Sequence, residues 1–165
     1  MAHSPAAAAV TDAELELREE SPLGADLAEI FARHRADMHA QTPPESIYMM
    51  GAEELACADV RFFTLRLAGK PMAMAALKRL DERNLELKSM HVMLEARGMG
   101  LSMRLLGDLF AIAREMGAES LSLETGREPI FAPATALYKK AGFVECPPFG
   151  SYTGDPNSLY MTRKL

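Results

Sequence analysis

One junction between two predicted elements constrains the fold more than any other feature of the sequence. Residues 85–93 alternate between apolar and polar side chains, as a half-buried strand does. Gly98 and Gly100 follow, and the apolar positions of residues 101–116 then recur with helical spacing until Gly117, which is placed to end the helix. We therefore predict a strand, a glycine turn and a long amphipathic helix.

Such a junction is suited to binding an anion. The unpaired N–H groups and the positive end of the dipole converge at a helix start, and Arg97 adds further donors there. A dinucleotide fingerprint starting at Gly98 fails because Met103 stands where glycine is needed, and the G-K-[ST] of a P-loop is absent. The nucleophile elbow G-x-S-x-G around Ser102 ends in Arg104. A hydrolase is therefore disfavoured.

The remaining pattern predicts an α/β or α+β fold, in which helices cover a sheet. The apolar spacing and the Pro and Gly breaks predict helices at residues 23–39 and 133–142, besides the one at 101–116. A short helical turn is expected at residues 53–57. The same signals predict strands around residues 15–17 and at 60–67, 72–77, 85–93, 120–124, 143–146 and 158–163.

Length and composition bound the function classes. A chain of 165 residues predicts one domain, here residues 11–165, preceded by a flexible Ala-rich arm at 1–10. The net charge of −5 disfavours nucleic acid as a partner. The only cysteines, Cys57 and Cys146, form no metal-binding or disulfide pattern, and no segment is long and apolar enough to enter a membrane. We expect a cytoplasmic protein without a metal.

Two motifs resemble those of the GNAT superfamily of N-acetyltransferases. Residues 97–102 are similar to its Q/R-x-x-G-x-G/A signature, except that Ser102 replaces the last small residue. Residues 136–143, ALYKKAGF, resemble its second recurring element, A-L-Y-x-x-x-G-F. The segments 36–39 with 43–46, and 155–158, further resemble a bacterial subgroup that acts on small acceptors.

The resemblance implies a cofactor, acetyl-CoA, and the residues that hold it. It implies a mixed, mostly antiparallel sheet of about seven strands, splayed to admit the cofactor, with helices on both faces and, as in many relatives, a possible homodimer. A backbone donor near Val92 would stabilise the oxyanion of the tetrahedral intermediate. The expected cofactor-binding residues are Met90, His91 and Val92 for the pantetheine arm, and Arg97, Gly98, Met99, Gly100, Leu101 and Ser102 for the pyrophosphate, with Tyr138 at the sulfur.

The resemblance also assigns two catalytic candidates. Tyr138 matches the tyrosine that protonates the departing CoA thiolate, although an aromatic residue that only packs on the sheet is the alternative. Glu86 matches by position a glutamate that acts as the base in the protein-acetylating branch. Its alternative is an ordinary pair with Lys88 on a solvated strand face.

The acceptor side has four candidates. His39 competes as a base through its pKa of about 6.5, unless it is merely exposed. Asp37 and Glu45, near the first helix, would attract an ammonium group, unless they belong to a solvated helix end. Glu124 closes the fifth strand, where many relatives carry asparagine, and is a further substrate-binding candidate.

These observations predict an acetyl-CoA-dependent N-acetyltransferase. We expect direct transfer to a primary amine, with a small molecule as the acceptor, because neither cysteine lies in a motif that suggests a covalent intermediate. Two alternatives stay open: a CoA-binding regulatory or vestigial domain without turnover, and a protein or peptide N-acetyltransferase.

Overall fold

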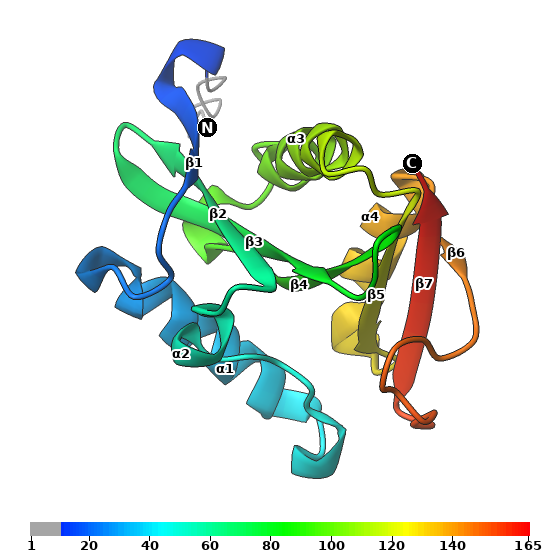
Figure 1. The fold of residues 1–165 in the computed structure, drawn as a ribbon. Coiled ribbons are helices and arrows are strands. Elements are labelled where there is room, and N and C mark those ends of the chain that lie inside the picture. Colours follow the sequence, from blue (N-terminus) through cyan, green and yellow to red (C-terminus); the bar gives the residue numbers. More distant parts are fainter. Residues whose placement is uncertain (1–10) are drawn as a thin grey trace, which may run out of the picture.

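A seven-stranded mixed sheet forms the centre of the molecule. The computed structural model describes residues 11–165, so the predicted arm at residues 1–10 lies outside the described residues. The strand order is β1-β2-β3-β4-β5-β7-β6, and β4 and β5 are the parallel neighbours (Figure 1). The strands are β1 (Leu15–Glu19), β2 (Val60–Leu67), β3 (Lys70–Arg79), β4 (Asn84–Val92), β5 (Ser120–Gly126), β6 (Val144–Glu145) and β7 (Ser158–Lys164).

The first four strands pair antiparallel with their neighbours, and β2, β3 and β4, which follow one another directly in the chain, form a meander. The continuous apolar run 72–77 is buried at every position, because β3 lies between β2 and β4 with helices above and below. The turn between β3 and β4 is closed by Asp81, whose carboxylate accepts backbone N–H bonds from Arg83 at 2.8 Å and from Asn84 at 2.9 Å. This turn sets the register that follows.

Helices cover both faces of the sheet (Figure 1). Helices α1 (Ala28–Gln41) and α2 (Ala52–Leu55) lie on one face, and α3 (Leu101–Glu115) lies on the opposite face. α4 (Ala132–Lys140) packs on the side of α3, where Tyr138, Phe143 and Phe110 form a chain of ring contacts. The short 3-10 turns are η1 (Asp12–Glu14), η2 (Ala25–Leu27), η3 (Pro44–Ser46), η4 (Leu94–Ala96) and η5 (Pro129–Phe131).

The predicted fold class is confirmed, but the first helix begins later than predicted. Leu23, its expected start, is 56% exposed in a turn where its N–H donates to the Ser21 hydroxyl at 3.2 Å. The side chain of Ser21 thus offers the backbone an alternative to helix. Along residues 11–165, none of the helices is both long and apolar enough to cross a membrane.

Candidate functional site

The cavity of the candidate site begins where β4 and β5 part. The two strands pair over three positions, from Asn84↔Ser120 to Glu86↔Ser122, and then diverge. A cavity of about 530 Å³ occupies the gap, and both strands, α1, α4 and the glycine turn contribute to its lining. Since the pairing ends at Glu86, no strand of the described residues 11–165 pairs with this edge of β4 beyond that point.

A bulge in β4 helps to turn the strand away from β5. Met74 on β3 pairs with His91 and Ala76 pairs with Lys88, so two residues of β4 stand opposite one of β3. Ser89 takes up the extra length with a left-handed φ of 55°. A bulge increases the local twist, and bulges are frequent beside active sites. The predicted pantetheine-binding residues 90–92 follow directly and line the cavity.

The glycine turn before α3 has the geometry of an anion cradle. Gly98 and Gly100 have φ angles of 82° and 78°, and apart from the adjoining residues no atom of residues 11–165 lies within 4 Å of a Cβ placed on either. Gly100 is the N-cap of α3, so the first N–H groups of the helix have no intrahelical acceptors. Leu101 is 2% exposed and can offer only its backbone, whereas Ser102 lines the cavity. The residues present therefore fit the pyrophosphate group of acetyl-CoA.

Arg97 connects this turn to α1. Its guanidinium donates to the Asp37 carboxylate at 3.0 Å and to the Val92 carbonyl at 3.3 Å. Asp37 also lies 3.9 Å from Nδ1 of His91. Asp37, predicted to bind the acceptor, therefore lies next to a predicted cofactor-binding residue at the rim of the cavity.

Tyr138 lines the cavity from α4. The side chain is 7% exposed and its ring meets that of Phe143 edge-on, with ring centroids 5.7 Å apart. Burial raises the pKa of the phenol well above its ordinary value. Such a phenol stays protonated at neutral pH, but the raised pKa makes it a weaker acid. The general-acid prediction is therefore supported by the place of Tyr138 in the cavity lining alone.

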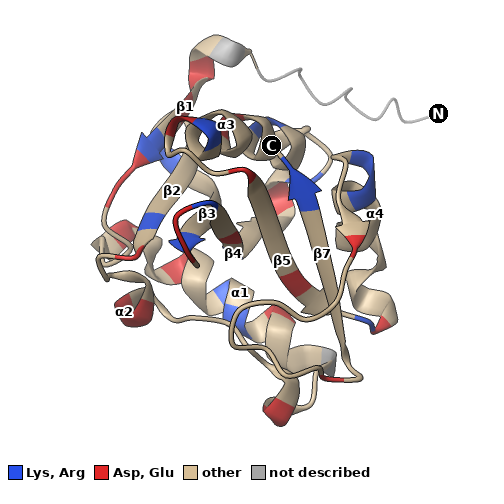
Figure 2. Cartoon of the chain, turned by 45° about the vertical axis from the view of Figure 1, so that its right-hand side comes forward, with Lys and Arg blue, Asp and Glu red and all other residues tan. Residues whose placement is uncertain are grey.

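Glu124 lines the same cavity from β5. Figure 2 shows one acidic band on β5, and Glu124 is the one acidic residue of the strand sequence SLSLETG. Burial raises the pKa of its carboxyl to about 7, partly offset by the Ser158 hydroxyl, which donates to it at 3.0 Å, and by the positive charge of Lys88. A carboxyl that titrates near neutral pH is suited to accept a proton.

Glu86 is placed differently. It is 3% exposed and does not line the cavity. Its carboxylate accepts a 2.6 Å hydrogen bond from the Tyr152 hydroxyl and lies 3.5 Å from the Lys88 ammonium. The alternative that we considered for Glu86, a pair with Lys88, is therefore present, but the pair is buried and does not lie on a solvated strand face.

Two loops meet above the acceptor side of the cavity. The Tyr48 hydroxyl donates to the Asp155 carboxylate at 2.7 Å, and the Asn157 amide donates to the Ser46 hydroxyl at 3.1 Å. The ring of Tyr48 also packs edge-on against that of Tyr152. These bonds join residues more than 100 positions apart, so no local sequence signal predicts them. To predict that the two loops pair, one would have to know the topology of the fold.

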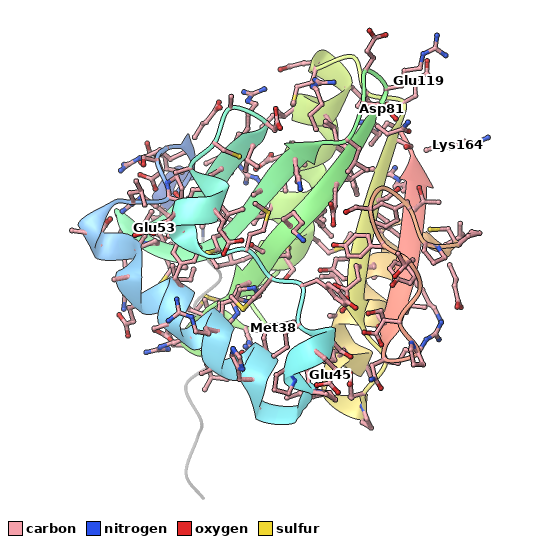
Figure 3. The ribbon with its side chains drawn as sticks, turned by 60° about the horizontal axis from the view of Figure 1, so that its bottom comes forward. Met38, Glu45, Glu53, Asp81, Glu119 and Lys164 are labelled. Carbon is pink, nitrogen blue, oxygen red and sulfur yellow. The ribbon has the colours of Figure 1, made fainter. Side chains whose placement is uncertain are left out.

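Two predicted acceptor residues lie outside the cavity lining. Met38 and Glu45, labelled in Figure 3, lie on α1 and on the turn that follows it. Met38 lines the cavity, whereas its neighbour His39 is exposed on α1 and Glu45 is exposed on η3. The structure therefore does not bring His39 or Glu45 together with Glu124 and Tyr138.

Residues 26–143 match the family described as Acetyltransferase (GNAT) family. The chain belongs to this family. It is 37% identical over 142 residues to a Bacillus subtilis protein named "Uncharacterized N-acetyltransferase YsnE", covering 86% of this chain and 94% of that protein. It is also 37% identical over 150 residues to "IAA acetyltransferase" of Azospirillum brasilense, covering 88% and 95%. This GNAT protein is therefore an acetyltransferase.

Solved structures share the fold. An acetyltransferase from Streptococcus agalactiae has a TM-score of 0.74 at 17% identity, covering 92% of this GNAT chain and 99% of that one. A GNAT family acetyltransferase from Elizabethkingia anophelis with acetyl-CoA bound has a TM-score of 0.68 at 14% identity, covering 94% and 100%. Within residues 11–165, this GNAT acetyltransferase has no cluster of three or more His, Cys, Asp or Glu side chains that could hold a metal ion.

Proposed function

We propose that this acetyltransferase transfers an acetyl group from acetyl-CoA to the primary amine of a small molecule, directly and within a ternary complex. One observation carries the proposal: Glu124 and Tyr138 line the same cavity, at the point where β4 and β5 part. A proton acceptor and a proton donor thus border one space. Direct transfer to an amine requires both.

Backbone groups hold acetyl-CoA. The N–H groups of residues 97–102 bind the pyrophosphate at the start of α3, and the free edge of β4 at residues 90–92 pairs with the amides of the pantetheine arm. Arg97 exchanges its Asp37 partner for a phosphate oxygen. The Elizabethkingia neighbour, which has the same fold and contains acetyl-CoA, supports this assignment.

Glu124 and Tyr138 divide the proton transfers. Glu124 takes a proton from the acceptor ammonium, and the freed nitrogen attacks the thioester carbonyl carbon, forming the C–N bond. The Val92 N–H stabilises the oxyanion. When the C–S bond breaks, Tyr138 donates its proton to the thiolate, and the nitrogen of the tetrahedral intermediate gives up its second proton, which restores the Tyr138 hydroxyl. We place the base at Glu124 rather than at the predicted Glu86, because Glu86 does not line the cavity.

The joined loops support a small acceptor. A peptide acceptor needs a groove that is open at both ends, whereas Tyr48–Asp155 and Asn157–Ser46 hydrogen bonds tie the two loops together over the acceptor side. Binding a protein segment here would first break both bonds. A small amine enters without that cost.

Titration calorimetry with acetyl-CoA and a thiol-release assay over a panel of amines test the proposal. We expect micromolar binding and amine-dependent thiol release, with kcat/KM about a hundredfold lower in Glu124→Gln, because a general base contributes about that factor or more. Glu86→Gln is the matched control and keeps most of its activity.

Three outcomes would contradict the proposal. Loss of activity in Glu86→Gln but not in Glu124→Gln would return the base to Glu86. Binding of acetyl-CoA with no amine-dependent release would indicate a CoA-binding domain without turnover. Acetylation of peptides but not of small amines would refute the small-acceptor assignment.

A further inference from the structure

The acceptor side of the cavity carries an excess of negative charge. The carboxyl of Glu124 lies within the electrostatic reach of two other carboxylates, Glu86 and Asp155, both of which raise its pKa. The opposing influence of a cation comes from Lys88. Glu124 and Lys88 line the cavity, whereas Glu86 and Asp155 lie outside its lining and act on Glu124 through their charges. Such a field attracts a cation and repels an anion.

Lys88, which lines the cavity, is held by three neighbouring groups. Its ammonium group donates to the Tyr48 carbonyl at 2.9 Å and to the Tyr152 hydroxyl at 3.1 Å, and it forms an ion pair with the Glu86 carboxylate at 3.5 Å. Two of its three N–H donors are therefore used in hydrogen bonds. Its charge is also balanced by Glu86. A carboxylate on the acceptor would have to compete with Glu86 for this ammonium group.

The other basic groups that line the cavity do not supply a substitute. His34 and His91 pack edge to face with ring centroids 5.2 Å apart, and burial lowers the pKa of each to about 4, so both are neutral at pH 7. Arg97 is bound to Asp37 and lies at the cofactor turn. None of them is free to receive an anionic group of the acceptor.

The wall of the acceptor side is largely apolar or aromatic. Met38 and Met49 line it together with Tyr48 and the two neutral imidazoles of His34 and His91. Methionine side chains adapt to irregular ligands and make favourable contacts with aromatic rings. The body of the acceptor is therefore expected to be apolar or aromatic.

We infer that the acceptor is a primary amine with an apolar or aromatic body and without a carboxylate on the carbon that carries the amine. This inference rests on the proposed function and names the substrate class of the same site. The ammonium group of such an amine lies at Glu124, in a field to which Glu86 and Asp155 contribute from outside the cavity lining. The corresponding amino acid would bring its carboxylate into the same field, where no free cation pairs with it.

The test compares acceptors that differ by this one group. Thiol release from acetyl-CoA is measured with 2-phenylethylamine against phenylalanine, tyramine against tyrosine, and 3-(methylthio)propylamine against methionine. We expect kcat/KM to be about a hundredfold higher for the amine of each pair, because like charges placed together in a partly desolvated site discriminate strongly. Phenylalaninol, in which an uncharged CH₂OH replaces the carboxylate, separates charge from bulk and is expected to match 2-phenylethylamine within a few-fold.

A substitution that changes the electrostatic field at the site gives a second measurement. Asp155→Asn removes one negative charge while an amide oxygen remains to accept a hydrogen bond within the loop. It lies outside the cavity lining, so activity with phenylalaninol is expected to stay within a few-fold of the wild type. The preference for 2-phenylethylamine over phenylalanine is expected to shrink several-fold.

The inference fails if any amino acid is used as well as its amine, which would mean that Lys88 or another cation receives the carboxylate. It also fails if phenylalaninol is as poor as phenylalanine, because bulk rather than charge would then discriminate. If acetyl-CoA binds but neither the amines nor the amino acids accelerate thiol release, the proposed function fails and the inference fails with it. Preference for the amines with normal Asp155→Asn selectivity would refute the assigned role of Asp155.

Discussion

Replacement of Glu124 by Gln is expected to make the protein more stable above neutral pH while it removes the proposed base. The pKa of this carboxyl is raised from its model-compound value of 4.5 to about 7 by burial. Between these two pH values the unfolded chain ionises at this position and the folded protein does not. Stability therefore falls as pH rises from about 4.5 to about 7 and then levels off.

The rise in pKa from 4.5 to about 7 lowers the free energy of unfolding by about 3 kcal/mol once the carboxyl is ionised in both the folded and the unfolded state. Gln carries no charge, and its carbonyl oxygen can still accept the 3.0 Å hydrogen bond from Ser158. Glu124→Gln is therefore expected to exceed the wild type by about 1 to 3 kcal/mol in the free energy of unfolding at pH 8. The melting temperature would rise by about 2–4 °C for each kcal/mol.

Urea unfolding at pH 5 and pH 8 measures this difference. At pH 5 the two proteins should differ little, because the folded wild type is protonated at Glu124. Glu82→Gln, in the exposed turn between β3 and β4, is the matched control and should show no such pH dependence. The stability difference between Glu124→Gln and the wild type should be larger at pH 8 than at pH 5. An equal difference at both pH values would refute the raised pKa. In the thiol-release assay, the wild-type kcat/KM should rise through pH 7 and this limb should disappear in the variant.

Three further substitutions, with Gly107→Ala as a control, test the other parts of the site. Tyr138→Phe keeps the ring contact with Phe143 but removes the hydroxyl, so kcat should fall about tenfold to a hundredfold while calorimetry shows unchanged acetyl-CoA affinity. Gly100→Ala forces an L residue into a φ of 78°, at a cost of about 1 kcal/mol, and should weaken acetyl-CoA binding several-fold in calorimetry. Gly107→Ala, inside α3 with no left-handed φ, should instead raise the melting temperature and leave the affinity unchanged. Asp37→Asn frees Arg97 from its ion pair and should tighten acetyl-CoA binding about twofold to fivefold; weaker binding would mean that Asp37 itself positions the ligand.

Local sequence patterns predicted the helices and strands that depend only on neighbouring residues in the chain. The helix at α3 follows from an apolar face bounded by Gly100 and Gly117, and it lies where the periodicity placed it. The end of α1 was predicted only approximately, because the helix continues past His39 to Gln41 before Pro43 and Pro44 stop it.

The acceptor side could not be predicted in the same way. The hydrogen bond between Tyr48 and Asp155 spans 107 positions, and the one between Tyr152 and Glu86 spans 66. Neither residue type nor spacing predicts such a contact, because it depends on how the assembled fold brings distant segments together. The burial that raises the pKa of Glu124 is likewise a property of the assembled cavity, not of the strand sequence.

The brief contact between β4 and β5 divides the sheet into two cooperative units. One consists of β1 to β4, and the other consists of β5, β7 and β6. Three residue pairs join them within the sheet, so we expect the amides of the two units to exchange at different rates. A pantetheine arm bound along the free edge of β4, as proposed, is expected to slow amide hydrogen exchange there. The ligand would then occupy the place of a neighbouring strand of β4.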